Sequence, residues 1–315
     1  MTSAIAARDL TKEYKGSKGK RALDRVTLDV GKGEIFGLIG RNGAGKTTFL
    51  RIAGTQLLPT SGHIEVLGHD AVEDPNAVRD LVAVIPQESR PFFYATPFEH
   101  VYYYLTLRGL PSSEARKRAM ETLERLGLTK GKDTVLWKQS GGLRRRVLVA
   151  MVLASGADLL FLDEPTTGLD PLARRDVWTA VEEAAKEGRT ILLTTHYLEE
   201  AELLSKRIGI LNEGKVLALG TLDELVARVR WPFRVALKGR GFEPAELASY
   251  GEAAAIGDSR LVFTDRGGAE DLTRLALARG VRAVAGPVTL EDLFVQLVGG
   301  TVDEEPVEED EEVDA

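Results

Sequence analysis

The strongest chemical signal in the sequence is the run GRNGAGKT at residues 40–47, in which three glycines precede a lysine and a threonine. The glycines allow backbone N–H groups to curl around a phosphate chain, and the helix expected to begin near Gly45 directs the positive end of its dipole at the same anion. Lys46 would then bridge the β- and γ-phosphates of a nucleotide, and the Thr47 hydroxyl would bind Mg²⁺. A chance glycine turn is the alternative, but a strand pattern precedes the run and a helix pattern follows it. The predicted nucleotide contacts here are Gly40, Asn42, Gly43, Ala44, Gly45, Lys46, Thr47 and Thr48.

A second signal lies at residues 159–164, where four apolar residues end in two carboxylates, Asp163 and Glu164. Ligands of α/β proteins bind at the carboxyl edge of the sheet, where such residues would lie. Asp163 would hold Mg²⁺ directly or through water, and Glu164 would orient and deprotonate an attacking water. His196 ends a third apolar strand, and the γ-phosphate is its natural target. Taken singly, exposed acids or a histidine at a strand end are common polar termini, so their order after a phosphate loop carries the prediction.

These side chains need a parallel sheet that brings several strand ends together. Three mostly apolar runs without alternation are expected to be strands covered on both faces: 34–40, 158–163 and 190–195. Residues 88–155 are predicted to be mainly helical, because segments such as 111–127 begin with Pro, Ser and Glu and end at glycine. Residues 1–225 therefore predict an α/β fold, with a mainly parallel sheet and a helical insertion.

A break near residues 230–232 separates a second, smaller α+β domain at 231–298. Its closing helix, 290–298, carries apolar residues at helical spacing and is expected to pack, either on its own domain or on that of a partner subunit. A dimer contact is favoured because so small a domain has little core of its own. Residues 299–315 are rich in acids and are expected to form a disordered tail that hydrolysis does not need. The apolar positions of the closing helix are Leu290, Leu293, Phe294 and Leu297.

Composition excludes several kinds of protein. The 315 residues include no cysteine, so disulfides, thiolate metal sites and cysteine nucleophiles are ruled out. The net charge is −7, but nine acids lie between residues 303 and 314, and without them it would be +2, which gives no broad attraction to nucleic acid. The longest fully apolar run has eight residues, too short for a bilayer, and charges near the N-terminus argue against an export signal. A cytoplasmic chain is expected, with any membrane role belonging to a partner.

The segment QSGGLRRRV at residues 139–147 separates this sequence from other phosphate-loop proteins. Ser140 can cap the following helix, and Gly141 and Gly142 leave its N-terminus open to an anion. Three arginines follow in the first turn, where positive charge opposes the helix dipole. A bound anion and a solvated basic face account for them equally well. The segment resembles the signature of the ATP-binding cassette (ABC) family, which usually reads LSGGQ and from which Gln139 and Leu143 depart.

The resemblance covers roughly residues 5–222 and implies the ABC fold, with ATP and Mg²⁺ as cofactors. It matches Tyr14 to the aromatic residue that stacks on adenine and Gln87 to the glutamine that links Mg²⁺ and water to a membrane partner. It also matches Asp170 to the loop that contacts the opposing subunit and His196 to the histidine at the γ-phosphate. The resemblance makes Lys46, Glu164, His196 and Gln87 catalytic residues and Thr47, Asp163 and Gln87 metal-binding residues.

Residues 165–171, 196–211 and 290–297 resemble the drug-resistance and ABC-2 exporter branch of the family. The resemblance implies an ATPase subunit that forms a dimer with itself or a related subunit and drives a separate integral membrane permease. Each ATP would lie between one subunit's phosphate loop and the other's signature, Ser140 to Gly142. Two alternatives stay open: a soluble ABC ATPase of translation or DNA repair, and a nucleotide sensor, which would have no use for Glu164.

Residues 91–105 hold seven of the seventeen Phe and Tyr residues in the chain. In the family this region lines a groove that receives a helix of the membrane subunit, which is the helix-in-groove mode of binding. The alternative is an aromatic core of the helical insertion, and about half of these rings are expected to be core. The seven residues are Phe92, Phe93, Tyr94, Phe98, Tyr102, Tyr103 and Tyr104.

Overall fold

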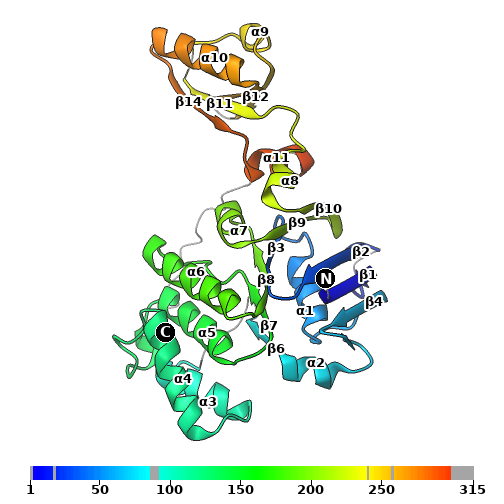
Figure 1. Cartoon of the computed structure of the whole chain (residues 1–315), viewed down its shortest axis with the longest axis vertical. Coiled ribbons are helices and arrows are strands. Elements are labelled where there is room, and N and C mark those ends of the chain that lie inside the picture. Colours follow the sequence, from blue (N-terminus) through cyan, green and yellow to red (C-terminus); the bar gives the residue numbers. More distant parts are fainter. Residues whose placement is uncertain (1–2, 17–18, 86–91, 240, 257–258, 299–315) are drawn as a thin grey trace. The chain divides into compact units, whose positions relative to one another are not determined.

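The computed structural model describes residues 3–16, 19–85, 92–239, 241–256 and 259–298. The predictions for Gln87 and for the tail at 299–315 lie outside these residues. The chain divides into two compact units, Met1–Leu222 and Asp223–Ala315 (Figure 1). The division falls three residues before the boundary expected at 225, because the short helix α8 (Leu222–Val226) already begins there.

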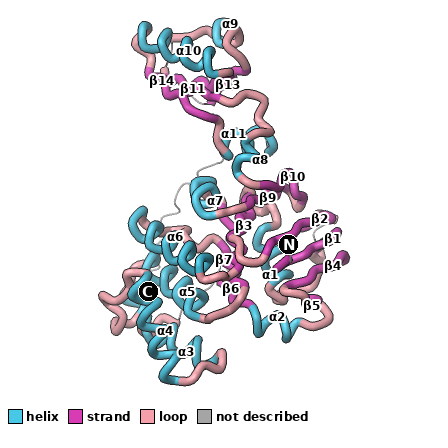
Figure 2. Tube along the Cα trace, viewed as in Figure 1, coloured by secondary structure: helices cyan, strands magenta, loops and turns pink. Residues whose placement is uncertain are grey.

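A six-stranded sheet forms the centre of the first unit (Figure 2). Its order is β10 (Lys215–Gly220), β9 (Arg207–Asn212), β3 (Ile35–Ile39), β8 (Thr190–Thr195), β7 (Leu159–Asp163) and β6 (Val82–Ile85). All neighbours pair in parallel except β10 and β9, so the predicted parallel α/β core is confirmed. The register aligns Ile39 with Thr195 and Asp163 with Thr194, which brings the ends of β3, β8 and β7 to one edge.

Two hydrophobic cores lie on opposite faces of this sheet, and β3, β6, β7 and β8 contribute residues to both. Leu160 and Leu162 of β7 pack in the core that includes Val147 and Val177 from the helices α5 (Gly141–Ala154) and α6 (Pro171–Lys186). Phe161, between them in sequence, packs in the other core, with residues of α1 (Lys46–Ala53). Burial on both faces explains why these strands show no polar alternation in sequence.

A second sheet of the first unit was not predicted. It is antiparallel, with the order β2 (Arg21–Gly31), β1 (Ser3–Glu13), β4 (Ser61–Val66) and β5 (His69–Asp70). Its buried residues share the core of α1. Irregular register between β1 and β2, with Asp9 and Arg25 at positive φ, interrupts the alternation of apolar and polar residues. Because of this interruption, the two strands lack the regular alternation of apolar and polar residues by which a strand is identified in a sequence.

The helical insertion lies where the sequence predicts it. It contains α3 (Pro97–Leu107), α4 (Ser112–Arg125), a 3₁₀ turn η1 (Leu136–Lys138) and α5. Thr96 and Glu99 form a reciprocal capping box at the start of α3. Of the seven aromatic residues, Phe98, Tyr102 and Tyr104 pack against the core, and Phe92, Phe93, Tyr94 and Tyr103 are exposed. The remaining helices of this unit are α2 (Pro75–Leu81) and α7 (Leu198–Leu204).

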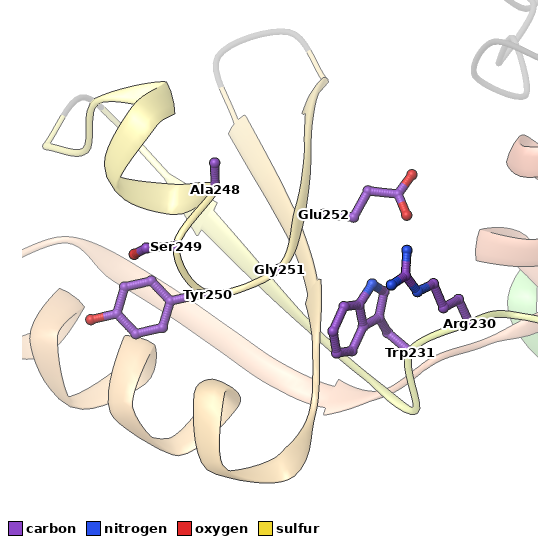
Figure 3. A pocket seen from close by; sticks show the side chains of 7 residues that line it. All are labelled: Arg230, Trp231, Ala248, Ser249, Tyr250, Gly251 and Glu252. Atoms are coloured by element: carbon purple, nitrogen blue, oxygen red, sulfur yellow. The ribbon is translucent and has the colours of Figure 1, made fainter.

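The second unit contains an antiparallel sheet with α10 (Arg266–Ala278) packed against it. The strand order is β12 (Glu252–Ile256), β13 (Ser259–Thr264), β11 (Phe233–Lys238) and β14 (Arg282–Pro287). The sequence analysis missed β12 and the one-turn helix α9 (Pro244–Leu247). The segment that joins α9 to β12 forms one wall of a hollow of about 600 Å³ (Figure 3). The hollow is lined by Arg230, Trp231, Ala248, Ser249, Tyr250, Gly251 and Glu252.

The closing helix α11 (Leu290–Val298) is already packed within a single chain. Leu290, Leu293 and Phe294 are buried, which leaves Leu297 as the exposed member of the predicted apolar face. The helix is tied to β11 by Arg234, whose guanidinium donates to the buried Asp292 carboxylate at 2.9 Å. Three of the four side chains on the predicted apolar face are therefore covered without a partner, so their spacing gives no reason to expect a dimer contact, which stays a prediction.

Candidate nucleotide-binding site

The phosphate loop joins β3 to α1 and needs glycine at two crowded positions. Gly45 precedes α1 with a φ of 110°, and a Cβ atom there would lie 2.4 Å from the Ala22 carbonyl oxygen. A Cβ atom at Gly40 would lie 2.3 Å from the Leu211 carbonyl oxygen. The tip of the loop, Asn42 and Gly43, is exposed. The loop is therefore held tightly at its base and is open to a ligand at its tip.

Lys46 joins the phosphate loop to the predicted catalytic carboxylates. Its ammonium group is buried, donates to the carbonyl oxygens of Gly40 at 2.8 Å and Arg41 at 3.2 Å, and lies 3.7 Å from Oε1 of Glu164. Burial lowers the pKa of Lys46, although the nearby charges of Glu164 and Asp163 oppose that effect. The structure thus brings together the cation and the base that the sequence analysis predicted separately.

Asp163 offers an oxygen ligand for a divalent cation. Its carboxylate is fully buried, and Oδ1 accepts a hydrogen bond from the Thr194 hydroxyl. Oδ2 is buried and has no hydrogen-bond partner among the described residues. Burial raises the pKa of Asp163, while hydrogen bonds from Thr194 and Thr47 oppose the increase.

The donor set around Asp163 fits Mg²⁺. A carboxylate oxygen that lacks a partner and the Thr47 hydroxyl are hard oxygen ligands of the kind that Mg²⁺ takes. Within the described ranges, no group of three or more His, Asp or Glu side chains could hold a metal by itself. The cation would therefore need nucleotide phosphates as further ligands, as is usual for Mg²⁺ at phosphate-binding sites.

Glu164 follows β7 in a left-handed conformation, with a φ of 48°. Its Oε2 lies 3.3 Å from Nδ1 of His196 and accepts a hydrogen bond from the Thr167 hydroxyl at 3.3 Å. Burial alone would raise the pKa of Glu164, but the adjacent His196 imidazole and the charge of Lys46 outweigh it, so the pKa lies below its usual value. Glu164 is thus held ready as an ionised carboxylate.

Replacing His196 with alanine is expected to move the acid limb of the kcat–pH profile toward neutral pH. Without His196, the largest of the effects that oppose burial is lost, so the pKa of Glu164 rises and the carboxylate is protonated, and unable to act as the predicted base, at higher pH than in the wild type. The measurement is steady-state ATPase activity from acidic to neutral pH. His63→Ala is the control, because His63 pairs with Glu65 at 3.2 Å on the surface. An acid limb at the same pH in both variants would contradict this role of His196.

The signature segment caps α5 and leaves its N-terminus exposed. The Ser140 hydroxyl accepts a hydrogen bond from the backbone N–H of Leu143 at 3.3 Å, as predicted for a cap. Ser140 and Gly141 are exposed, and Gly142 is partly so. The side-chain amide of Gln139 donates to Gly131 and Thr134 carbonyl oxygens, and Leu143 packs against the core. The two departures from the family signature are thus accommodated by local packing.

The three arginines of α5 do not form a solvated basic face. Arg144 donates to the Gln139 carbonyl oxygen at 3.1 and 3.0 Å. Arg146 donates to the Leu126 carbonyl oxygen at 3.1 Å. Arg145 donates to the carbonyl oxygens of Asp163 and Glu164. Each of the three guanidinium groups therefore donates a hydrogen bond to at least one backbone carbonyl oxygen of its own chain.

The structure places Tyr14 beside the phosphate loop. Its hydroxyl lies 3.3 Å from the Thr48 hydroxyl, the residue is 42% exposed, and the Lys12 ammonium lies 5.4 Å from the centre of its ring. Asp170 caps α6 by accepting hydrogen bonds from the N–H groups of Leu172 at 3.0 Å and Ala173 at 2.9 Å. These hydrogen bonds, that of Ala173 foremost, lower the pKa of Asp170.

The sequence analysis also missed two buried polar residues, of which Thr194 contacts Asp163 and Glu164. Thr194 of β8 donates to Asp163 and also accepts a hydrogen bond from the backbone N–H of Glu164 at 3.2 Å. Glu200 of α7 is fully buried and accepts hydrogen bonds from the Thr166 hydroxyl at 2.8 Å and from Nε1 of Trp178 at 2.9 Å. Burial raises the pKa of Glu200. The run of two threonines before His196 is the one local signal for Thr194.

Comparison with known proteins agrees with this geometry. The sequence pattern of the ABC transporter family matches residues 23–167. The chain is 42% identical over 224 residues to the daunorubicin/doxorubicin resistance ATP-binding protein DrrA of Streptomyces peucetius, covering 71% of this chain and 67% of that protein. It is also 38% identical over 224 residues to ATP-binding cassette sub-family A member 7 of Rattus norvegicus, but spans 10% of that much longer protein.

A solved structure shows the same fold. An ATP-binding cassette, described as a dimer in a post-hydrolysis state bound to ADP and Pi, superposes with a TM-score of 0.64 and 26% identity, over 69% of this chain and 98% of that one. Among the residues that the structure of the present chain describes, no helix has both the length and the apolar character needed to cross a bilayer. From its phosphate loop, its paired carboxylates and these relatives, the chain belongs to the ABC transporter family as an ATP-binding, ATP-hydrolysing subunit similar to those of the drug-resistance branch.

Proposed function

We propose that two copies of this chain, or one copy and a related subunit, close around two ATP molecules and thereby drive export through a separate membrane permease. The observation that carries the proposal is the exposure of the two surfaces that would contact one nucleotide. The tip of the phosphate loop, at Asn42 and Gly43, is open, and so is the N-terminus of α5 at Ser140 and Gly141. Each ATP is held between the loop of one subunit and the signature of the other.

In this proposal the chain acts mainly by positioning and electrostatics. Tyr14 stacks on adenine, Lys46 neutralises phosphate charge, and Thr47 and Asp163 hold Mg²⁺. When bound, the metal adds positive charge at the β- and γ-phosphates. Glu164 orients the attacking water and accepts its proton, and the ionised state favoured by Lys46 and His196 suits that role. His196 contacts the γ-phosphate.

The permease contact is assigned to the exposed aromatic residues near the start of the helical insertion. Phe92 is 80% exposed, Tyr94 is 86% exposed and Tyr103 is 55% exposed. Aromatic rings that remain in contact with water are suited to receive an apolar helix. This contact would hold the chain at the cytoplasmic face of the membrane. Export rests on similarity to a protein named for daunorubicin and doxorubicin resistance.

A mixture of two inactive variants is expected to recover turnover if the signature acts on the partner's ATP. Lys46→Met disables the phosphate loop, and Gly141→Glu places a negative charge where the phosphate would approach the helix. Gly141 tolerates a side chain because an added Cβ atom would meet no neighbour within 4 Å. A mixed dimer keeps one intact composite site, so an equimolar mixture should regain about a quarter of wild-type ATPase activity.

The two variants measured alone serve as controls and should both be inactive. A mixture that stays inactive at every ratio would contradict a signature that acts across the dimer. Co-purification of the wild-type chain with an integral membrane protein separates the proposed transporter from its competitor, a soluble ABC ATPase or regulator without a membrane partner.

A further inference from the structure

Of the three arginines, Arg145 hydrogen-bonds to the backbone at the end of β7, where the two predicted functional carboxylates lie. Its Nη2 atom donates to the carbonyl oxygen of Glu164 at 2.9 Å and also to the carbonyl oxygen of Asp163. Its neighbours point elsewhere: Arg144 contacts Gln139, and Arg146 contacts Leu126 and the Asp176 carboxylate. One side chain of α5 is therefore attached to the backbone that carries both functional carboxylates.

These contacts fix the peptide groups on both sides of Glu164. The peptide between Asp163 and Glu164 has its carbonyl bound by Arg145, and its N–H donates to the Thr194 carbonyl oxygen at 3.0 Å. The next carbonyl, of Glu164 itself, is also bound by Arg145, and the following residue is proline, which has no N–H. The left-handed φ of 48° at Glu164 is strained for a residue with a side chain, so it needs support from its surroundings.

Arg145 also lies close to the end of α5 that carries the signature segment. Ser140 caps α5, and Arg145 follows within its first two turns. The exposed N-terminus of α5 is the surface that, in the proposed function, contacts the partner's ATP. Any displacement of α5 on that contact would be passed through Arg145 to the backbone of Glu164.

We propose that Arg145 is a positioning residue that couples the signature helix to the catalytic carboxylates of its own subunit. It touches neither nucleotide and acts by holding the backbone from which Glu164 is aimed. Through it, engagement of one ATP by the signature adjusts the base at the other ATP. This inference rests on the proposed function, because it requires Glu164 to be the base and the signature to act across the dimer.

The first test separates turnover from ATP binding. Arg145→Ala is expected to lower kcat by about 10- to 100-fold, because misplacement of a catalytic group by about 1 Å has effects of this size. The dissociation constant of a fluorescent ATP analogue should change by less than about threefold, since Arg145 is attached to the carboxylates and not to the phosphate loop. Arg145→Lys keeps the charge but lacks the planar fork, so it should recover part of the turnover and covers the case of an unstable alanine variant.

Arg146→Gln is the matched control in the same turn of α5. It removes contacts to Leu126 and Asp176, so it is expected to reduce thermal stability slightly and to leave kcat within about twofold. A general weakening of α5 would lower kcat in both variants alike. Equal losses for Arg146→Gln and Arg145→Ala would therefore overturn the proposal, as would wild-type kcat in Arg145→Ala.

A double variant tests whether Arg145 acts through Glu164. If it does, Arg145→Ala should not lower the residual turnover of Glu164→Gln by more than about twofold, because the group it positions is already disabled. If Arg145→Ala lowered the turnover of Glu164→Gln by the same factor as it lowers that of the wild type, Arg145 would act independently of Glu164, and the inference would be overturned. Wild-type turnover in Glu164→Gln alone would instead reject the assignment of the base, so the two failures are distinguishable.

Discussion

Replacing Glu164 with glutamine is expected to lower kcat for ATP hydrolysis by about 10²- to 10⁴-fold, the range that a general base contributes. The amide has the size of the carboxylate and can still accept the hydrogen bond from Thr167, but it cannot take a proton from water. Lys46 and the phosphate loop are unchanged, so ATP binding and dimer formation should persist. The variant is therefore expected to accumulate as an ATP-bound dimer.

Single-turnover hydrolysis and analytical ultracentrifugation with Mg-ATP would measure both effects. Glu200→Gln is a matched control, because it makes the same substitution at a fully buried carboxyl that accepts hydrogen bonds from Thr166 and Trp178. Burial raises the pKa of Glu200, and an amide oxygen can accept the same two hydrogen bonds, so kcat should stay close to that of the wild type. Comparable losses in the two variants would show that the Glu164 effect comes from disturbed packing and not from a missing base.

The parts of the site that the sequence predicts are those encoded by neighbouring residues. The phosphate loop is specified within eight residues, because a strand end, two crowded glycine positions and a helix start follow one another directly. Asp163 and Glu164 are predicted for the same reason, since an apolar strand that ends in acids fixes their place at the sheet edge. Ser140 caps α5 as expected because a cap depends on one hydroxyl and the N–H three residues later.

The parts that the sequence does not predict depend on contacts between distant segments. Arg145 reaches carbonyl oxygens eighteen and nineteen residues away, and its type alone fits a solvated surface equally well. Glu200 is a glutamate in a helix, a residue type normally expected at the surface, yet tertiary packing buries it against Thr166. The closing helix shows the same limit, because the spacing of Leu293 and Phe294 predicts that they are buried but not by which chain.

Replacing Lys46 with methionine is expected to weaken ATP binding by about 10²-fold or more. A hydrogen bond to a charged group contributes about 1.5–3 kcal/mol, and loss of contacts to two phosphates therefore corresponds to at least two powers of ten. Methionine has a similar length and removes a buried charge, so the loop should still fold. Glu164 would lose the cation 3.7 Å away, so its pKa should rise, and turnover should fall even at saturating ATP.

Isothermal titration with Mg-ATP gives the affinity, and thermal unfolding shows whether the fold is retained. Lys215→Met is the matched control, because Lys215 is 61% exposed and lies 3.5 Å from the Asp24 carboxylate. An exposed pair contributes about 1 kcal/mol or less to stability and lies outside the phosphate loop, so this variant should bind ATP as the wild type does. Wild-type affinity in Lys46→Met would mean that the buried ammonium serves only to hold Gly40 and Glu164 in place. Equal losses of ATP affinity in both variants would mean that Lys46 acts through the summed positive charge of the protein. In that case the affinity should also fall as salt is added, because salt screens long-range attraction but not a buried contact.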